Sequence, residues 1–178
     1  MSFLAQRITK WSTFCDRMLH RLICYIDTTA DYSLWCRCGK DLPAALGLAL
    51  FCDADFASCT QTARSTTGVH LAFVGPKPFF PLSAVSKRQT VISHSTPESE
   101  LVAADYGLRM EGIPALCLWE YLLDIPVNLV LCEDNESAAR IIQTGRNPTM
   151  RHLARTRKVD LGYLHERFMV EDLFHQDR

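Results

Sequence analysis

The sequence predicts an α/β fold with a mixed five-stranded sheet, three antiparallel strands followed by parallel strands, flanked by helices. Between residues 46 and 86, apolar runs of strand length are separated by short turns, which favours antiparallel pairing. After residue 95, runs with helical spacing alternate with strand-like runs, as in a sheet covered by helices. We therefore divide the chain into an N-terminal helical extension, residues 1–45, and an α/β domain, residues 46–178.

The composition of the 178-residue chain fits one such domain with an extension. Apolar residues make up 48% of the chain, which suffices for a core, and the 22% of charged residues is ordinary for a globular protein. The formal net charge of −1 excludes a globally basic protein, although a local basic face is compatible with it. No apolar run approaches the roughly 18 residues that a membrane-spanning helix needs, so no membrane partner is expected.

The eight cysteines leave two interpretations open, a disulfide scaffold or reduced thiols. Their spacing is irregular, no signal peptide is visible, and Cys52 and Cys132 fall inside expected core strands. These observations favour reduced thiols in an intracellular protein, cytoplasmic or nuclear. The Cys36-Arg37-Cys38 segment lacks the spacer and the second cysteine pair of a zinc site, so no zinc is expected.

The extension is expected to form one amphipathic helix over residues 3–29, because its apolar residues recur at helical spacing. Packing against a neighbouring surface is the favoured interpretation of the apolar face, with membrane or nucleic-acid binding as the alternatives. Residues 28–45 mix polar residues with Gly39 and Pro43, and we expect a linker there with a short strand at 32–37.

In the α/β domain, five strands are expected at 46–53, 68–74, 79–86, 127–132 and 168–174. A helix is expected from Ser95 to Gly112-Ile113-Pro114, where the proline should break it or start a second helix over 115–123. Further helices are expected over 135–143 and 152–167. Ser95 and Glu98 have the spacing of a capping box, in which each residue satisfies an N–H group at the start of the helix. Gly145 is suited to end the helix over 135–143.

Three segments far apart in the sequence end or begin on a carboxylate. Asp53 ends the first strand, Asp134 follows the fourth strand, and Glu100 lies early in a helix. If the first and fourth strands are parallel neighbours, these acids meet at one edge of the sheet and suit a divalent-metal site. Taken singly, each acid also has a structural explanation, as a solvent-facing strand end, a partner of the helix dipole or a helix cap.

Six motifs, in this order along the chain, resemble the RNase H domain of Copia-type LTR retrotransposon Pol polyproteins. They are Asp53-Ala54-Asp55-Phe56-Ala57, Ala63-Arg64-Ser65-Thr66-Thr67-Gly68, Ser86-Lys87-Arg88-Gln89, Ser95-Thr96-Pro97-Glu98-Ser99-Glu100, Glu133-Asp134-Asn135-Glu136-Ser137-Ala138, and Arg151-His152 with Arg155-Thr156-Arg157-Lys158-Val159-Asp160. The resemblance covers the chain from about residue 46 to its end and implies an RNase H-like fold. The N-terminal helix resembles the segment that connects the reverse transcriptase to RNase H.

In that family an Asp-Glu-Asp-Asp set binds two divalent ions, Mg²⁺ or Mn²⁺. The resemblance places the first three acids at Asp53, Glu100 and Asp134, with Asp55 and Glu98 as the neighbouring acids most easily confused with them. The implied activity is endonucleolytic hydrolysis of the RNA strand of an RNA–DNA hybrid. The implied partners are that hybrid and the reverse transcriptase portion of the parent polyprotein.

The resemblance also implies substrate contacts. Ser95, Thr96 and Asn135 would meet the minor groove of the hybrid, where 2′-hydroxyls and groove shape are recognised rather than sequence. Arg64 would meet a phosphate. The densest group of basic residues allows two interpretations, a phosphate-binding patch or a solvated helix face. It consists of Arg151, His152, Arg155, Arg157 and Lys158.

The chain departs from the family pattern at its C-terminal end. The fourth acid of the family follows the fifth strand, and neither Asp172 nor Asp177 matches its motif, so we expect a C-terminally truncated fragment. Asp160 matches a recurrent family position for which a structural or surface role is expected. A set of three acids predicts an impaired nuclease, and the alternative is a catalytically dead fold that binds hybrids or a protein partner.

Overall fold

The computed structural model describes residues 2–5, 7–37, 45–170 and 174–175, which fall into two compact units, Met1–Cys36 and Arg37–Arg178. The first unit contains α1 (Ser2–Ala5), a short 3₁₀ helix η1 (Ile8–Lys10) and α2 (Thr13–Thr29). The single helix expected over 3–29 is therefore wrong, because the chain leaves the helical conformation before Ser12 caps α2. The strand expected at 32–37 is also wrong, since these residues form no ladder, and 38–44 lie outside the described residues.

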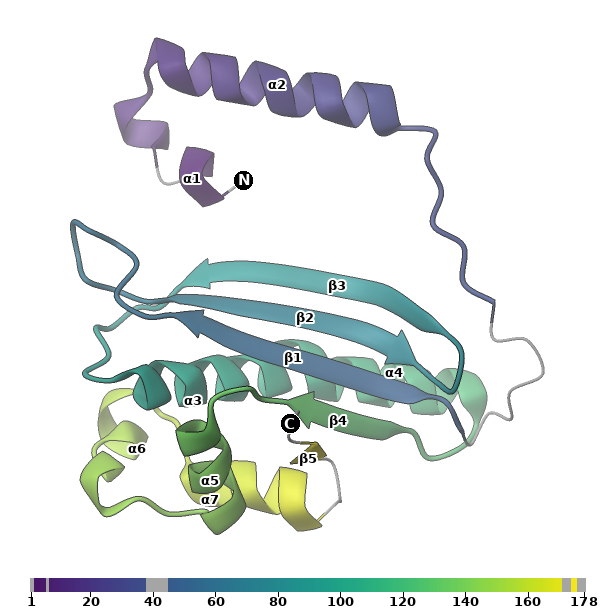
Figure 1. The fold of residues 1–178 in the computed structure, drawn as a ribbon, viewed down its shortest axis with the longest axis vertical. Coiled ribbons are helices and arrows are strands. Elements are labelled where there is room, and N and C mark those ends of the chain that lie inside the picture. The colour runs from purple at the N-terminus through teal and green to yellow at the C-terminus, as the bar shows by residue number, and fades with distance from the viewer. Residues whose placement is uncertain (1, 6, 38–44, 171–173, 176–178) are drawn as a thin grey trace. The chain divides into compact units, whose positions relative to one another are not determined.

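The second unit is built on a sheet with the strand order β3-β2-β1-β4-β5 (Figure 1). Strands β1 (Gly47–Asp55), β2 (Thr66–Val74) and β3 (Phe79–Arg88) pair antiparallel, as predicted. Only β2 and β3 are joined by a short turn, at 75–78, whereas the longer segment 56–65 connects β1 to β2. Strand β4 (Asn128–Cys132) pairs parallel with β1. This mixed sheet with flanking helices confirms the predicted fold class and is consistent with an RNase H-like fold.

The fifth strand is much smaller than expected. Strand β5 (Phe174–His175) contributes two residues beside β4, so the sheet has four full strands and a short fifth segment. The expected start of this strand, Phe168, lies instead in a π-helical turn, η5 (Glu166–Val170), where its side chain is fully buried. The residues between these two elements, 171–173, lie outside the described residues.

One long helical rod runs along a face of the sheet (Figure 1). It consists of α3 (Thr96–Gly107), a π-helical turn η3 (Leu108–Gly112) and α4 (Ile113–Leu123). Of the two alternatives expected at Gly112-Ile113-Pro114, a break or the start of a second helix, the structure has the second, because α4 begins at Ile113 without the chain leaving the helical conformation. Pro114 occupies the first turn of α4, where its missing N–H group is tolerated.

The remaining helices are short. Helix α5 (Glu136–Thr144) ends at Gly145, whose φ of 66° is the left-handed conformation expected of a helix-ending glycine. The single helix expected over 152–167 is wrong. It is divided into α6 (Leu153–Thr156), after the 3₁₀ turn η4 (Pro148–Met150), and α7 (Leu161–His165). The division follows from Lys158, whose φ is 57°, and from Asp160, which caps α7.

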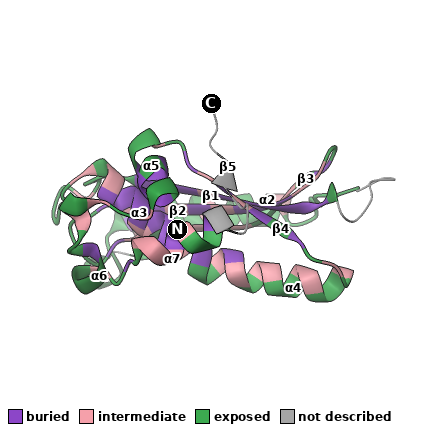
Figure 2. Cartoon of the chain, turned by 90° about the horizontal axis from the view of Figure 1, so that it is seen from below, coloured by how far each residue is buried: buried purple, intermediate pink, exposed green. Residues whose placement is uncertain are grey.

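The core lies between the sheet and α3. Alternate residues of β1 and β4 face it, among them Leu48, Leu50, Leu129 and Leu131. Gly107 allows α3 to approach the sheet closely, because a Cβ atom there would lie only 2.5 Å from Cys52 Sγ. Figure 2 shows that the buried residues concentrate in the strands and α3, whereas α4 carries half-buried and exposed residues. Among the described residues, no helix is both long and apolar enough to cross a membrane.

Candidate functional site

The predicted first and second aspartates lie at the ends of neighbouring parallel strands. The β1–β4 pairing runs from Gly47 opposite Asn128 to Phe51 opposite Cys132. Asp53 and Asp134 each follow two residues after the last pair, on the same edge of the sheet. From the sequence, these acids come together only if the first and fourth strands are parallel neighbours. The structure meets this condition.

Strand β1 presents two acids on one face. Cys52 and Ala54 are buried, whereas Asp53 and Asp55 are exposed, as the period-two alternation of a strand requires. Because β1 continues to Asp55, both carboxylates lie on the same face of the strand. Asp55 therefore remains a neighbouring candidate beside Asp53.

Glu100 is held beneath this edge by α3. It is only 4% exposed, and the backbone N–H group of Ala54 donates to its carboxylate. Burial, followed by the charges of Glu133, Asp53 and Asp134, raises the pKa of Glu100 to about 8. The three predicted acids and Glu133 therefore belong to one electrostatic group, although they come from three separate elements.

Glu133 is a member of this group that the sequence argument missed. It is 1% exposed, and the backbone N–H group of Asn135 donates to its Oε1 atom at 3.1 Å. Burial, together with the charges of Asp134 and Asp53, raises the pKa of Glu133 to about 7, against the lowering effect of the Asn135 hydrogen bond. The sequence could have indicated that Glu133 is buried, because it continues the alternation that buries Leu129 and Leu131 in β4.

Two oxygens of this acidic group lack hydrogen-bond partners. The Oε2 atoms of Glu100 and Glu133 are buried, and no donor within the described residues reaches either of them. Unsatisfied carboxylate oxygens are suitable ligands for Mg²⁺ or Mn²⁺. In the same described part of the chain, however, no three His, Cys, Asp or Glu side chains are gathered closely enough to hold a metal ion. The ligand chemistry fits a divalent cation, and the side chains are not assembled around one.

Glu98, the other neighbouring acid, has a different environment. Its side chain is 2% exposed and accepts hydrogen bonds from Arg157 Nη2 at 2.7 Å and from the backbone N–H group of His94 at 2.8 Å. His152 Nε2 lies 3.5 Å away. The expected cap is present, since Ser95 Oγ accepts from the backbone N–H of Glu98, although Glu98 reaches back to His94 rather than to Ser95. Its carboxylate is thus occupied by an ion pair.

The residues expected to meet nucleic acid lie around the starts of two helices. Ser95 caps α3 and Thr96 is exposed beside it, while Asn135 caps α5 by accepting from the backbone N–H of Ala138 at 3.0 Å. Arg64 is exposed and lines a hollow of about 410 Å³ together with His94, the residue before Ser95. The structure therefore brings Arg64 to the start of α3.

The basic group at 151–158 does not form one solvated face. The Arg157 side chain is 5% exposed and donates to Glu98 and to the carbonyl oxygen of Ile92, so it belongs to the interior. Arg151, Arg155 and Lys158 are exposed. Asp160 accepts from the backbone N–H groups of Gly162 and Tyr163 and caps α7, which is a structural role. Asp172 and Asp177 lie outside the described residues.

Comparison with known proteins gives one partial relative. The chain is 35% identical over 83 residues to an uncharacterized mitochondrial protein of Arabidopsis thaliana. The aligned segment covers 47% of this chain and only 31% of the Arabidopsis protein. No protein-family model and no solved structure matches the chain.

Proposed function

We propose that the chain is a retrotransposon-derived RNase H domain, which hydrolyses the RNA strand of RNA–DNA hybrids with divalent ions bound by Asp53, Glu100 and Asp134. One observation carries the proposal. Two exposed aspartates lie at the same edge of the parallel strands β1 and β4 as the buried Glu100, whose pKa is raised to about 8 by burial and then by the charges of Glu133, Asp53 and Asp134. Mutual repulsion among carboxylates is what a bound divalent cation would relieve.

Two kinds of similarity support different parts of this proposal. The partial match to the Arabidopsis mitochondrial protein supports the broader part, a retrotransposon-derived chain. The six Copia-type motifs, which include all three proposed ligands, support the narrower part, an RNase H domain.

The proposed metal ligands differ in how far they are exposed to solvent. Asp53 and Asp134 are exposed to solvent, whereas Glu100 is buried and held by the Ala54 N–H group. Glu133 adds negative charge from below, and its Oε2 atom has no donor within the described residues. When bound, Mg²⁺ or Mn²⁺ ions would activate a water molecule and stabilise the leaving oxygen of the cleaved phosphate.

The substrate contacts remain compatible with the caps that the same residues form. Ser95 uses its hydroxyl oxygen as an acceptor, so its O–H group can still donate to a 2′-hydroxyl. Asn135 accepts through Oδ1, which leaves its amide NH₂ group to donate. We propose that these residues and Thr96 meet the minor groove, and that Arg64 meets a phosphate beside the start of α3.

A second function is a fold that binds hybrids or a protein partner without cleaving RNA. It is favoured by the absence, among the described residues, of any three acids close enough to hold an ion.

A cleavage assay distinguishes these functions. The purified chain is incubated with a labelled RNA–DNA hybrid in Mn²⁺, beside Asp134→Asn and the matched control Asp124→Asn, which neutralises an exposed acid at the end of α4. The proposal expects RNA cleavage by the wild type and the control and its loss in Asp134→Asn. Hybrid binding without cleavage by a folded wild-type sample would favour the second function, and cleavage that survives Asp134→Asn would remove Asp134 from the site.

A further inference from the structure

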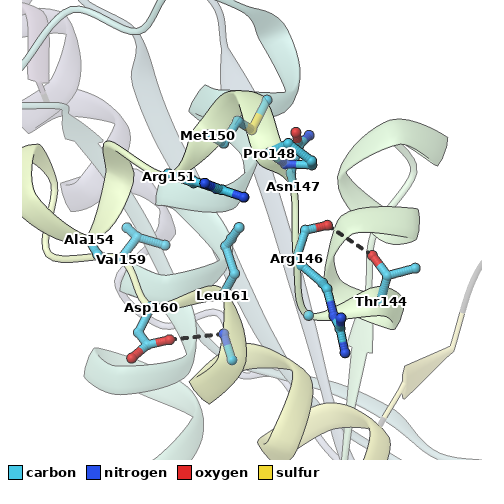
Figure 3. A pocket seen from close by; sticks show the side chains of 12 residues that line it. Thr144, Arg146, Asn147, Pro148, Met150, Arg151, Ala154, Val159, Asp160 and Leu161 are labelled. Atoms are coloured by element: carbon cyan, nitrogen blue, oxygen red, sulfur yellow. Dashed lines mark hydrogen bonds between the residues drawn. The ribbon is translucent and has the colours of Figure 1, made fainter.

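A pocket separate from the acidic group lies between the end of α5, the η4 turn and the start of α7 (Figure 3). Its volume of about 510 Å³ is typical of sites for small molecules, which span roughly 300–1,000 Å³. Helix α5 has 9 residues, so its length separates the pocket at Gly145 from Asp134 by about 13 Å. The pocket is therefore distinct from the proposed metal site.

The inner wall of the pocket is apolar. Val159 is buried, and Met150 and Leu161 are half-buried and pack against the core. Pro148 and Ala154 extend this wall toward the rim. Because these groups are anchored in the core, the apolar surface is preformed and offers contact to a ring or an aliphatic chain.

Two arginines give the pocket a positive charge. The Arg151 side chain projects over Leu161 toward the segment that carries Asn147, and Arg146 lines another wall (Figure 3). Neither guanidinium group has an ion-pair partner among the residues that the structure describes. Asp160, the acid in the lining, already accepts N–H groups of Gly162 and Tyr163 through Oδ1. The lining thus carries two cations against one acid that is engaged in capping.

We propose that this pocket binds a small organic anion with an apolar ring or chain. The apolar part lies against Val159, Leu161 and Met150, and the acidic group meets Arg151, with Arg146 adding positive potential. An arginine can hold a carboxylate, sulfonate or phosphate through two parallel N–H donors. A bare inorganic anion would leave the apolar wall unused, and a neutral apolar molecule would leave Arg151 unpaired. The proposal does not depend on hybrid cleavage.

A matched pair of probes tests both halves of this proposal. The probes are 8-anilinonaphthalene-1-sulfonate and N-phenyl-1-naphthylamine, which share their aromatic rings while only the first carries an anionic group. Binding is measured by fluorescence titration of the full chain, with circular dichroism to verify that each variant is folded. The variants are Arg151→Glu, Arg146→Glu, Ala154→Trp and, as the matched control on α6, Arg155→Glu, whose side chain is exposed outside the lining.

The proposal expects Arg151→Glu to weaken the sulfonate at least tenfold and the neutral probe less than twofold, with a smaller selective effect of Arg146→Glu. Ala154→Trp, which fills the pocket, should weaken both probes, and Arg155→Glu should weaken neither. Equal affinity of the sulfonate for Arg151→Glu and Arg155→Glu would overturn the proposal. A competition experiment gives a second test. If an RNA–DNA hybrid displaces the sulfonate probe and excess naphthalene-1-sulfonate does not, the proposal is overturned and the pocket belongs to a nucleic-acid surface.

Discussion

Glu98 and Glu100 are two acids of the same helix, both nearly fully buried, and their surroundings are opposite in charge. Glu98 is paired with Arg157 and accepts a backbone N–H group. Burial, followed by the charges of Glu133, Asp53 and Asp134, raises the pKa of Glu100 to about 8. Side chains two positions apart in an α-helix point in directions that differ by about 200°. Helix α3 therefore directs Glu98 toward α6 and Glu100 toward the strand ends.

The difference teaches that burial alone does not tell a structural acid from a functional one. A buried carboxylate with a cation and donors is a satisfied part of the interior. A buried carboxylate surrounded by other carboxylates is stable only if it binds a proton or a cation, and such groups are candidates for functional sites. The following predictions separate the two regions, from the largest expected effect to the smallest.

The largest effect is expected from the Glu98 side. Arg157→Ala would leave the buried Glu98 carboxylate without its cation, and breaking such a pair costs about 3–5 kcal/mol of unfolding free energy. Urea denaturation followed by circular dichroism measures this loss. Arg157→Met with Glu98→Gln should recover part of it, because no unpaired charge then remains. A loss below about 1 kcal/mol in Arg157→Ala would show that the pair is unimportant.

Neutralising Glu100 should stabilise the protein at high pH, in contrast to the loss of stability expected for Arg157→Ala. The folded-state pKa of Glu100, about 8, lies above its unfolded value of 4.5. Its contribution to stability is therefore complete below pH 4.5 and is lost as the pH rises to about 8. Glu100→Gln should make the protein more stable than the wild type at pH 9 by roughly 1–3 kcal/mol, and little different at pH 4.5.

Urea denaturation of both proteins at these two pH values tests this expectation. Glu133→Gln is the matched variant, with a smaller effect in the same direction because the pKa of Glu133 rises only to about 7. A difference between wild type and Glu100→Gln that is the same at both pH values would mean that Glu100 does not titrate in this range.

A divalent cation should stabilise the folded protein by binding to the acidic group of Asp53, Glu100, Glu133 and Asp134, and not to the Glu98 pair. At ten times its dissociation constant, Mg²⁺ is expected to raise the unfolding free energy by about 1.4 kcal/mol. The effect should be stronger at pH 8.5 than at pH 6, because ligand carboxyls must lose their protons. Thermal melts with and without Mg²⁺ measure it, with Asp134→Asn expected to abolish the shift and Asp124→Asn to keep it. Retention of the whole shift in Asp134→Asn would place the cation elsewhere.

The smallest effects are expected at the caps beside the two regions. Asn135 accepts from Ala138 at 3.0 Å, whereas Ser95 accepts from Glu98 at the longer distance of 3.4 Å. Asn135→Ala should therefore cost about 1 kcal/mol and Ser95→Ala roughly 0.5 kcal/mol. Chemical denaturation of both variants ranks the two caps, and the reverse order would show that the Ser95 cap is the stronger one.

The sequence predicted the parts of the site that depend on local pattern. Apolar runs indicated strands at 46–53 and 127–132, which lead to Asp53 and Asp134, and the structure pairs the corresponding strands β1 and β4 in parallel. The Ser95 cap and the glycine stop at Gly145 follow from preferences of single residues, and both are present. The roles of Asp53, Glu100 and Asp134 as metal ligands stay predictions.

Long-range contacts account for what the sequence could not predict. Arg157 and Glu98 are 59 positions apart, so nothing local indicates that this arginine leaves the basic group to pair with a buried acid. Glu133 was missed because an acid is rarely expected in a buried position, although strand alternation places it there. The helix over 152–167 was overextended because a left-handed residue at Lys158 is not favoured by its side chain and is imposed by the fold around it.

The π turn between α3 and α4 has a consequence for how this chain can vary among relatives. A π turn accommodates one extra residue in a helix, and each residue rotates all later side chains by about 100°. Trp119, which stacks on Phe73 with ring centroids 4.5 Å apart, lies beyond the turn. Because the π turn absorbs its extra residue locally, deleting the exposed Met110 should return the rod to a regular α-helix and keep Trp119 directed at Phe73. A homologue with a one-residue gap at the π turn should therefore keep its aromatic anchor at the aligned position, whereas a one-residue gap elsewhere in the rod should occur together with changes throughout α4.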